Sequence, residues 1–118
     1  MKRIQSIEEQ VARIIVAEAR AAGAEIIEVD VGHATVNETQ GDDDIVQAML
    51  CAGEVAIHFY SATEGREWRP RLGWMFLTPG NAISVDAAME MICDYGVNPW
   101  MDNLYKKLEL AIEGKVLS

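Results

Sequence analysis

Basic residues are missing from a long central part of this chain. No lysine or arginine occurs between Ala21 and Gly65, whereas the same stretch holds nine acidic residues. The 118 residues together carry a formal net charge of −9. Non-specific nucleic-acid binding depends on neutralising phosphates with lysine and arginine, so this charge argues against that class of protein. We expect no nucleic-acid partner and one strongly negative part of the surface.

Cysteines and long apolar runs are also few. Cys51 and Cys93 are far apart and outside any C-x-x-C spacing, a pattern typical of free thiols in a reducing compartment. Each is expected to be a small buried hydrophobe. Charged residues such as Glu8 and Arg13 interrupt the apolar residues of segment 1–20, which is therefore neither a signal peptide nor a membrane span. We expect a cytoplasmic protein without membrane contact.

The standard catalytic and cofactor motifs are absent. The chain has no Walker, G-x-G-x-x-G or G-x-S-x-G pattern. The acids Asp42–Asp44 lack the alternation and the glycine of a calcium loop, and favour a helix start instead. His33 and His58 fall on predicted strands, where Asp30 or Asp94 can be neighbours, but they lack metal-ligand spacing. We expect no metal and no cofactor.

Length and composition predict one domain over residues 1–118. Half of the residues are hydrophobic and a quarter are charged, and a chain of this size buries a real core without a metal or disulfide. The predicted fold class is α+β. We expect a small antiparallel sheet of three to four strands packed by N- and C-terminal helices, in the order α-β-α-β-β-(α or β)-α.

Local signals predict three helices. Ser6–Glu9 has the pattern of a capping box, apolar residues follow at helical spacing, and Gly23 can supply the stop. A short helix is expected after Asp42–Asp44, ending at Gly53. Asn98–Pro99 is typical of a helix start and predicts a last helix to about residue 113.

The clearest strand signals form a hairpin in Glu54–Asn81. Alternation places Val55, Ile57 and Phe59 on one face of its first strand. It places Leu72, Trp74 and Phe76 together on one face of its second. The predicted core contains these positions: Ile14, Val29, Ile57, Phe59, Trp74, Phe76, Leu104 and Leu108.

Two further segments complete the predicted sheet. Residues 24–36 follow period two and are expected to form a first strand. Segment 84–95 is ambiguous, because it fits a helix over 84–91, whereas Met89–Tyr95 also fits a third strand beside Leu72–Leu77.

The most distinctive constellation lies between the hairpin strands. Arg66, Trp68, Arg69 and Arg71 combine an aromatic ring with guanidinium groups, and both residue types are enriched at interface hot spots. This cluster is therefore a candidate binding surface. One alternative is a solvated turn in which Trp68 packs on the core and the arginines pair with the chain's own acids. Another is homodimerisation, with the arginines of one copy meeting the acidic half of a second.

A second candidate site needs a carboxylate buried beneath the tryptophans. An apolar cavity raises the pKa of a carboxyl group into the range of general acid–base catalysis. The residues considered for such a pocket are Asp30, His58, Tyr60, Asp94 and Tyr95. Ordinary surface carboxylates on half-exposed strands are the alternative interpretation.

The last third of the chain suggests a family. The runs GWMFLTPGN and MICDYGVNPWMDNL resemble the ends of small uncharacterised accessory proteins of mobile elements, such as integron cassettes, phages and plasmids. The resemblance implies an accessory gene and carries over no functional residue.

Taken together, these features favour non-catalytic binding over catalysis. We expect an acidic binding or adaptor protein that contacts a protein partner or a second copy of itself. The alternative is a small-molecule-binding domain or enzyme with a buried carboxylate or histidine in an aromatic-lined pocket. Mimicry of a nucleic acid by the acidic surface ranks third, because the arginine cluster and helix lysines interrupt its charge.

Overall fold

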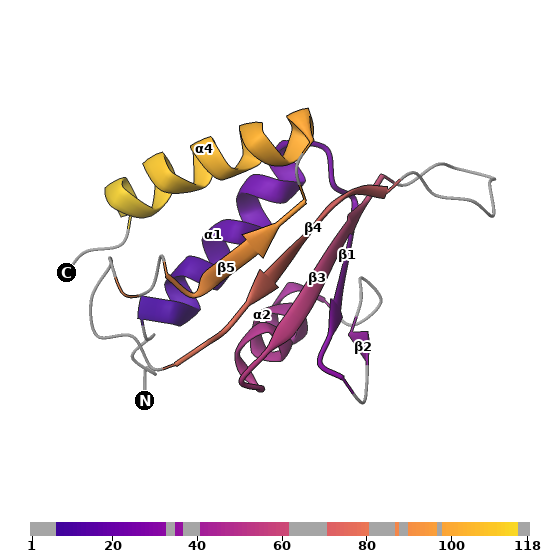
Figure 1. Ribbon diagram of the computed structural model, residues 1–118, viewed down its shortest axis with the longest axis vertical. Coiled ribbons are helices and arrows are strands. Elements are labelled where there is room, and N and C mark those ends of the chain that lie inside the picture. Colours follow the sequence, from indigo (N-terminus) through magenta and orange to yellow (C-terminus); the bar gives the residue numbers. More distant parts are fainter. Residues whose placement is uncertain are drawn as a thin grey trace.

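A computed structural model describes residues 7–32, 35–36, 41–61, 71–80, 87, 90–96 and 98–115. The elements are α1 (Ile7–Ala21), β1 (Ile26–Asp30), β2 (Thr35–Val36), α2 (Asp42–Leu50), β3 (Val55–Tyr60), β4 (Arg71–Leu77), β5 (Ile92–Tyr95) and α4 (Pro99–Lys115). The strands form one antiparallel sheet in the order β2-β1-β3-β4-β5 (Figure 1). The predicted α+β class is confirmed. The sheet has four longer strands, and the two-residue β2 adds a fifth.

Helix α1 ends as the sequence predicts. Gly23 adopts a positive φ of 111°, and the N–H of Ala24 donates to the carbonyl of Ala19 at 2.9 Å. This left-handed turn satisfies carbonyls of the last helical turn and redirects the chain into β1. Ser6, the first residue of the expected capping box, lies outside the described residues.

The predicted first strand is divided into β1 and β2. Gly32 has a φ of 97°, and its N–H donates to Oδ1 of Asp30 at 2.8 Å. This side-chain turn ends β1, after which Thr35 and Val36 pair back on Asp30 and Val29. The expectation of one continuous strand over 24–36 was wrong. The alternation of apolar and polar residues does not reveal that the chain turns back between two short strands.

Strands β3 and β4 form the predicted hairpin. However, the face of β4 that packs against the core is the opposite of the predicted one. Val55, Ile57 and Phe59 are fully buried, as predicted. Their buried counterparts on β4 are Gly73, Met75 and Leu77. Trp74 and Phe76, predicted to be core residues, are only half-buried and lie on the other face of the sheet.

Gly73 explains this choice of face. A Cβ atom at Gly73 would overlap with Cγ and Sδ of Met101, which is fully buried on α4. The missing side chain allows α4 to pack closely on the sheet. Of the predicted core, the other six residues are buried: Ile14, Val29, Ile57, Phe59, Leu104 and Leu108.

The ambiguous segment includes a strand. Ile92–Tyr95 pairs with β4, and the pairing is extended by hydrogen bonds from the N–H of Thr78 to the carbonyl of Met91 and from the N–H of Gly96 to the carbonyl of Trp74. The alternative of a strand beside β4 is therefore confirmed for these residues. Most of the helix considered over 84–91 lies outside the described residues.

The last helix begins as predicted. Oδ1 of Asn98 accepts a hydrogen bond from the N–H of Met101 at 3.0 Å, and Pro99 is the first helical residue. Trp100 then joins α4 to the end of α1, because its Nε1 donates to the carbonyl of Ala22 at 2.9 Å. Its ring also lies 5.6 Å from that of Phe59.

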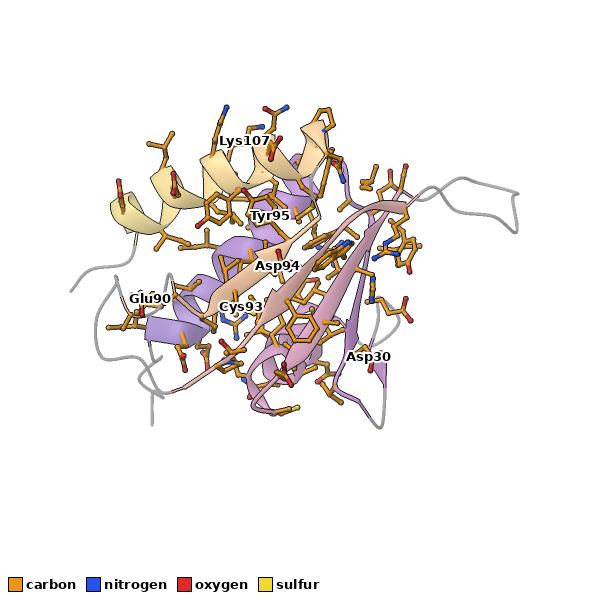
Figure 2. The ribbon with its side chains drawn as sticks, viewed as in Figure 1. Asp30, Glu90, Cys93, Asp94, Tyr95 and Lys107 are labelled. Atoms are coloured by element: carbon orange, nitrogen blue, oxygen red, sulfur yellow. The ribbon has the colours of Figure 1, made fainter. Side chains whose placement is uncertain are left out.

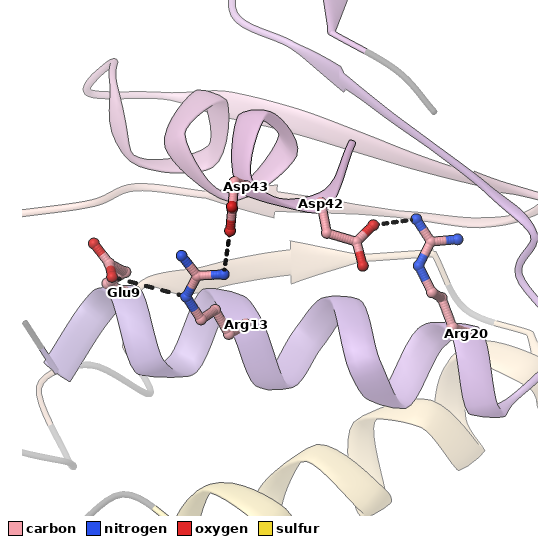
Figure 3. A network of polar contacts seen from close by, with 5 residues as sticks. All are labelled: Glu9, Arg13, Arg20, Asp42 and Asp43. Carbon is pink, nitrogen blue, oxygen red and sulfur yellow. Dashed lines mark hydrogen bonds and ion pairs between the residues drawn. The ribbon is translucent and has the colours of Figure 1, made fainter. Parts of the chain in front are cut away.

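Arginines on α1 hold the start of α2. Nη1 of Arg13 lies 2.8 Å from Oδ1 of Asp43, and Arg20 pairs with Asp42 (Figure 3). Glu9, one helical turn before Arg13, lies 3.8 Å from its Nε. The acidic run therefore marks a helix start, as expected, and also binds α1 to α2.

Neither cysteine is a buried hydrophobe. Cys51 and Cys93 are both free and exposed, so that prediction was wrong. Cys51 follows the last turn of α2, where its thiol contacts the carbonyl of Ala48 at 3.3 Å. Cys93 stands between the paired residues Asp94 and Ile92 at a register shift in β5. Cys51 thus lies at the end of a helix and Cys93 at an irregularity in a strand.

None of the described helices is both long and apolar enough to cross a membrane.

Candidate functional site

The helices α1, α2 and α4 cover one face of the sheet, and in the described part of the chain no helix or strand packs on the other face (Figure 1). We call this second surface the open face. Strand alternation and, at the register shifts beside Arg71 and Asp94, cross-strand pairing assign its residues: Ile26, Glu28, Asp30, Ala56, His58, Tyr60, Arg71, Trp74, Phe76 and Asp94. Antiparallel sheets commonly leave one face to solvent, and that face is then mostly polar. Here its centre is aromatic.

The central row of the open face joins three strands. Glu28 lies opposite His58, and His58 lies opposite Trp74. The indole of Trp74 extends over the backbone of Gly96, since a Cβ atom there would lie 3.0 Å from its Nε1. A carboxylate, an imidazole and an indole therefore stand side by side at the middle of the sheet.

His58 is the most electrostatically perturbed group of this row. Burial lowers the pKa of His58 below its usual 6.5, and the charge of Arg71 lowers it further, whereas Glu28 and Asp30 act in the opposite direction. Its Nδ1 is buried and has no hydrogen-bond partner among the described residues. The imidazole is therefore held in the neutral form more strongly than a histidine in water.

Tyr60 flanks the histidine on the same strand. Their ring centroids are 6.4 Å apart. Burial raises the pKa of Tyr60, and so do the charge of Glu28 and a hydrogen bond with that carboxylate, while Arg71 opposes the shift. Burial chiefly, and Glu28 in addition, thus favour the protonated phenol, which lies beside the exposed Arg71 that pairs with Tyr60 across the hairpin.

A second row is apolar in the middle and acidic at both ends. Asp30 lies opposite Ala56, Ala56 opposite Phe76, and Phe76 opposite Asp94. Both carboxylates are exposed, and on this face they lie towards opposite edges of the sheet (Figure 2). Oδ1 of Asp94 also accepts from the N–H of Tyr95 at 2.8 Å.

The structure places four of the five pocket candidates on the open face. Asp30, His58, Tyr60 and Asp94 share this surface, but Asp30 and Asp94 are exposed instead of buried beneath a tryptophan. Tyr95 belongs to the opposite side, where it stacks on Tyr105 of α4 with ring centroids 4.8 Å apart (Figure 2). A pocket built around a buried aspartate is therefore not what these residues form.

The arginine and tryptophan cluster is described only in part. Arg66, Trp68 and Arg69 lie outside the described residues, and His33 does so as well. Arg71 is the first residue of β4 and lies on the open face beside Tyr60. Of the predicted cluster, Arg71 thus belongs to the open face.

The described residues contain no cluster suited to a metal ion, and the depression that they line between α1 and α2 is small. No group of three or more histidines, cysteines and carboxylates in residues 7–32, 35–36, 41–61, 71–80, 87, 90–96 and 98–115 is arranged to hold a metal ion. One depression of about 100 Å³ lies between α1 and α2, lined by Arg13, Val16, Ala17, Asp42 and Val46. Small-molecule sites are typically several times larger, about 300 to 1,000 Å³.

The aromatic character of the open face was missed in the sequence. Trp74 and Phe76 were assigned to the core because large apolar residues at alternate positions usually face inward. A signal was present in β4, where Gly73, Met75 and Leu77 form a second apolar set on the other face. A strand that is apolar on both faces indicates a sheet with something to bind on each side.

Comparison with protein-family models, with curated proteins and with solved structures gave no match. The geometry of the open face is therefore the basis for the functional assignment.

Proposed function

We propose that this chain is a non-catalytic binding protein that contacts a protein partner through the open face of its sheet. One observation carries the proposal: Trp74 and Phe76 are only half-buried, and they lie on the face opposite the helices and outside the core cluster. The apolar surface that these side chains leave in contact with water contributes favourable free energy only when a binding partner covers it. Aromatic residues at the centre of a surface are also the usual anchors of protein interfaces.

The shape and charge of the face support binding over catalysis. The open face is a sheet surface, and its carboxylates Asp30 and Asp94 are exposed to water. An acid–base site needs a carboxyl group desolvated in an apolar cavity. Broad contact with another protein requires only an apolar centre with a polar rim, which this face has.

Two other expectations belong to the same proposal. The exposed free thiols Cys51 and Cys93 support a reducing, cytoplasmic setting. The resemblance of the last third to accessory proteins of mobile elements implies an accessory gene, and we include that expectation in the proposal without assigning any chemistry from it.

The test removes each aromatic anchor in turn. Wild-type protein selects binders from a displayed peptide library, and dissociation constants for the selected peptides are then measured by calorimetry for Trp74→Ala and Phe76→Ala. A hot-spot anchor contributes about 2 kcal/mol or more, so we expect each variant to bind roughly 30-fold more weakly.

Leu110→Ala provides the matched control, because Leu110 is 74% exposed on α4. It should leave every dissociation constant unchanged, and thermal melts should show all three variants folded. Sedimentation of the wild type and Trp74→Ala separates binding of a partner from self-association. Selected peptides that bind Trp74→Ala as tightly as wild type would refute the proposal.

A further inference from the structure

We propose that the occupant of the open face is a basic protein segment, in which apolar side chains alternate with or adjoin lysine and arginine. This inference rests on the proposed function and specifies the chemistry of the partner. It depends on where the charges stand around Trp74 and Phe76.

Carboxylates border the aromatic centre on both sides. Glu28 and Asp30 project from β1 on one side, and Asp94 projects from β5 on the other. The strand order β1-β3-β4-β5 places Trp74 and Phe76 between these margins. If a bound segment places an apolar side chain on the aromatic centre, lysine or arginine residues on either side of that side chain would therefore lie near a carboxylate.

The aromatic rings favour the same charge. A cation over the face of an indole or phenol ring is attracted to its π electrons, typically by about 0.5 to 2 kcal/mol. Trp74 and Tyr60 supply such rings on the same face as Glu28. Arg71, at the hairpin end of the face, is the only cation that the described strands place there.

A second copy of the chain fits this face poorly. Stacking two open faces would bring together two surfaces bordered by carboxylates, on molecules with a net charge of −9 each. Like charges facing each other across an interface cost free energy. Complementary charge is available only from a basic partner.

Pairing along the sheet edges is also disfavoured. On β5 the carboxylate of Asp94 already accepts from the N–H of Tyr95, which blocks one donor of the edge. The opposite edge strand, β2, has two residues. Short or blocked edges protect a sheet against strand addition, so the face is the better docking surface.

The experiment uses three synthetic peptides of equal length with the same tryptophan and leucine positions. Their intervening residues are all lysine, all glutamine or all glutamate. Binding to the full chain is measured by fluorescence anisotropy at low and at near-physiological salt. We expect the lysine peptide to bind at least about tenfold more tightly than the glutamine peptide, the glutamate peptide to bind least, and the difference to shrink with salt.

Two triple variants locate the charges responsible. Glu28→Gln, Asp30→Asn and Asp94→Asn together neutralise the margins of the open face but keep an oxygen acceptor at each position. Asp102→Asn, Glu109→Gln and Glu113→Gln neutralise exposed acids of α4 and change the net charge equally. The face variant should lose most of the preference for lysine over glutamine, while the helix variant keeps it within about twofold.

The outcomes separate this inference from the proposed function. If the glutamine or glutamate peptide binds as tightly as the lysine peptide but Trp74→Ala abolishes binding, the open face binds proteins and the basic partner is wrong. Equal losses in the two triple variants would also overturn it, because net charge alone would then explain the preference. Self-association that Trp74→Ala removes would identify a second copy as the occupant. If no peptide shows binding sensitive to Trp74→Ala, the proposed function fails together with the inference.

Discussion

At the scale of single residues, position on a face decides what a side chain does. Phe59 and Trp74 are both large aromatic residues of the central hairpin, yet Phe59 is fully buried and Trp74 is not. Phe59 contributes to stability by filling the core. Trp74 is available to a partner, and its truncation is expected to affect binding more than folding.

Gly73→Ala tests the closest contact between sheet and helix. The added methyl group would overlap with the buried Met101, and overpacking of this kind costs typically about 1 to 3 kcal/mol. We expect the free energy of unfolding, measured in urea, to fall by that amount. Gly53→Ala is the control, because nothing lies within 4 Å of a Cβ atom there. Equal stability of Gly73→Ala and wild type would show that α4 does not pack as described.

His58 makes stability depend on pH. Burial lowers the pKa of His58 in the folded chain below the 6.5 of a solvated histidine. The unfolded chain therefore binds a proton at a higher pH than the folded chain does, so this contribution is present above about pH 6.5 and is lost as the pH falls below it.

His58→Gln should remove that dependence. Melting temperatures measured from about pH 7.5 down to about 5.5 should fall less steeply for His58→Gln than for wild type. His33 is present in both proteins, so it contributes equally to each profile. Parallel profiles would contradict the burial of the imidazole on the open face.

At the scale of elements, a few side chains fix how the helices meet the sheet. Trp100 donates to the carbonyl of Ala22, and its ring lies against that of Phe59, so one residue of α4 contacts both the end of α1 and the last part of β3. On the other side of α1, Arg13 and Arg20 bind the acids that begin α2. Because these ion pairs are partly exposed to water, each contributes little to stability.

Trp100→Phe tests the contact between α4 and α1. The substitution keeps an aromatic ring but removes the indole N–H that donates to the carbonyl of Ala22. This hydrogen bond is partly buried, and such a bond contributes about 1 kcal/mol net. We expect a loss of about 1 to 2 kcal/mol in the free energy of unfolding, together with faster amide exchange near Ala22. Arg20→Gln removes a partly exposed ion pair near the end of α1 and should cost less. A larger loss for Arg20→Gln than for Trp100→Phe would reverse this ranking.

At the scale of the whole molecule, the two faces of the sheet differ in what covers them. The helices occupy one side of the sheet, the aromatic residues occupy the middle of the other, and carboxylates border them. An acidic protein that concentrates half-buried aromatic rings between negative margins is suited to a partner with the opposite charge.

The sequence by itself determined where several elements begin, end and alternate. The stop at Gly23, the start at Asn98–Pro99, the acids in the first turn of α2 and the alternation in β3 all predicted local structure correctly. These signals depend on interactions between residues close in sequence, so they can be recognised without knowing the fold.

Only the tertiary structure decided which side of each strand is the inside. In β4 both faces are apolar, and the packing of Met101 against Gly73 selects the face with Gly73 as the core face. The exposure of Cys93 follows from a register shift against β4 that no local pattern encodes. Alternation gives the two sets of side chains, but contacts between residues distant in the chain determine which set is covered, and thus where the open face and its candidate site lie.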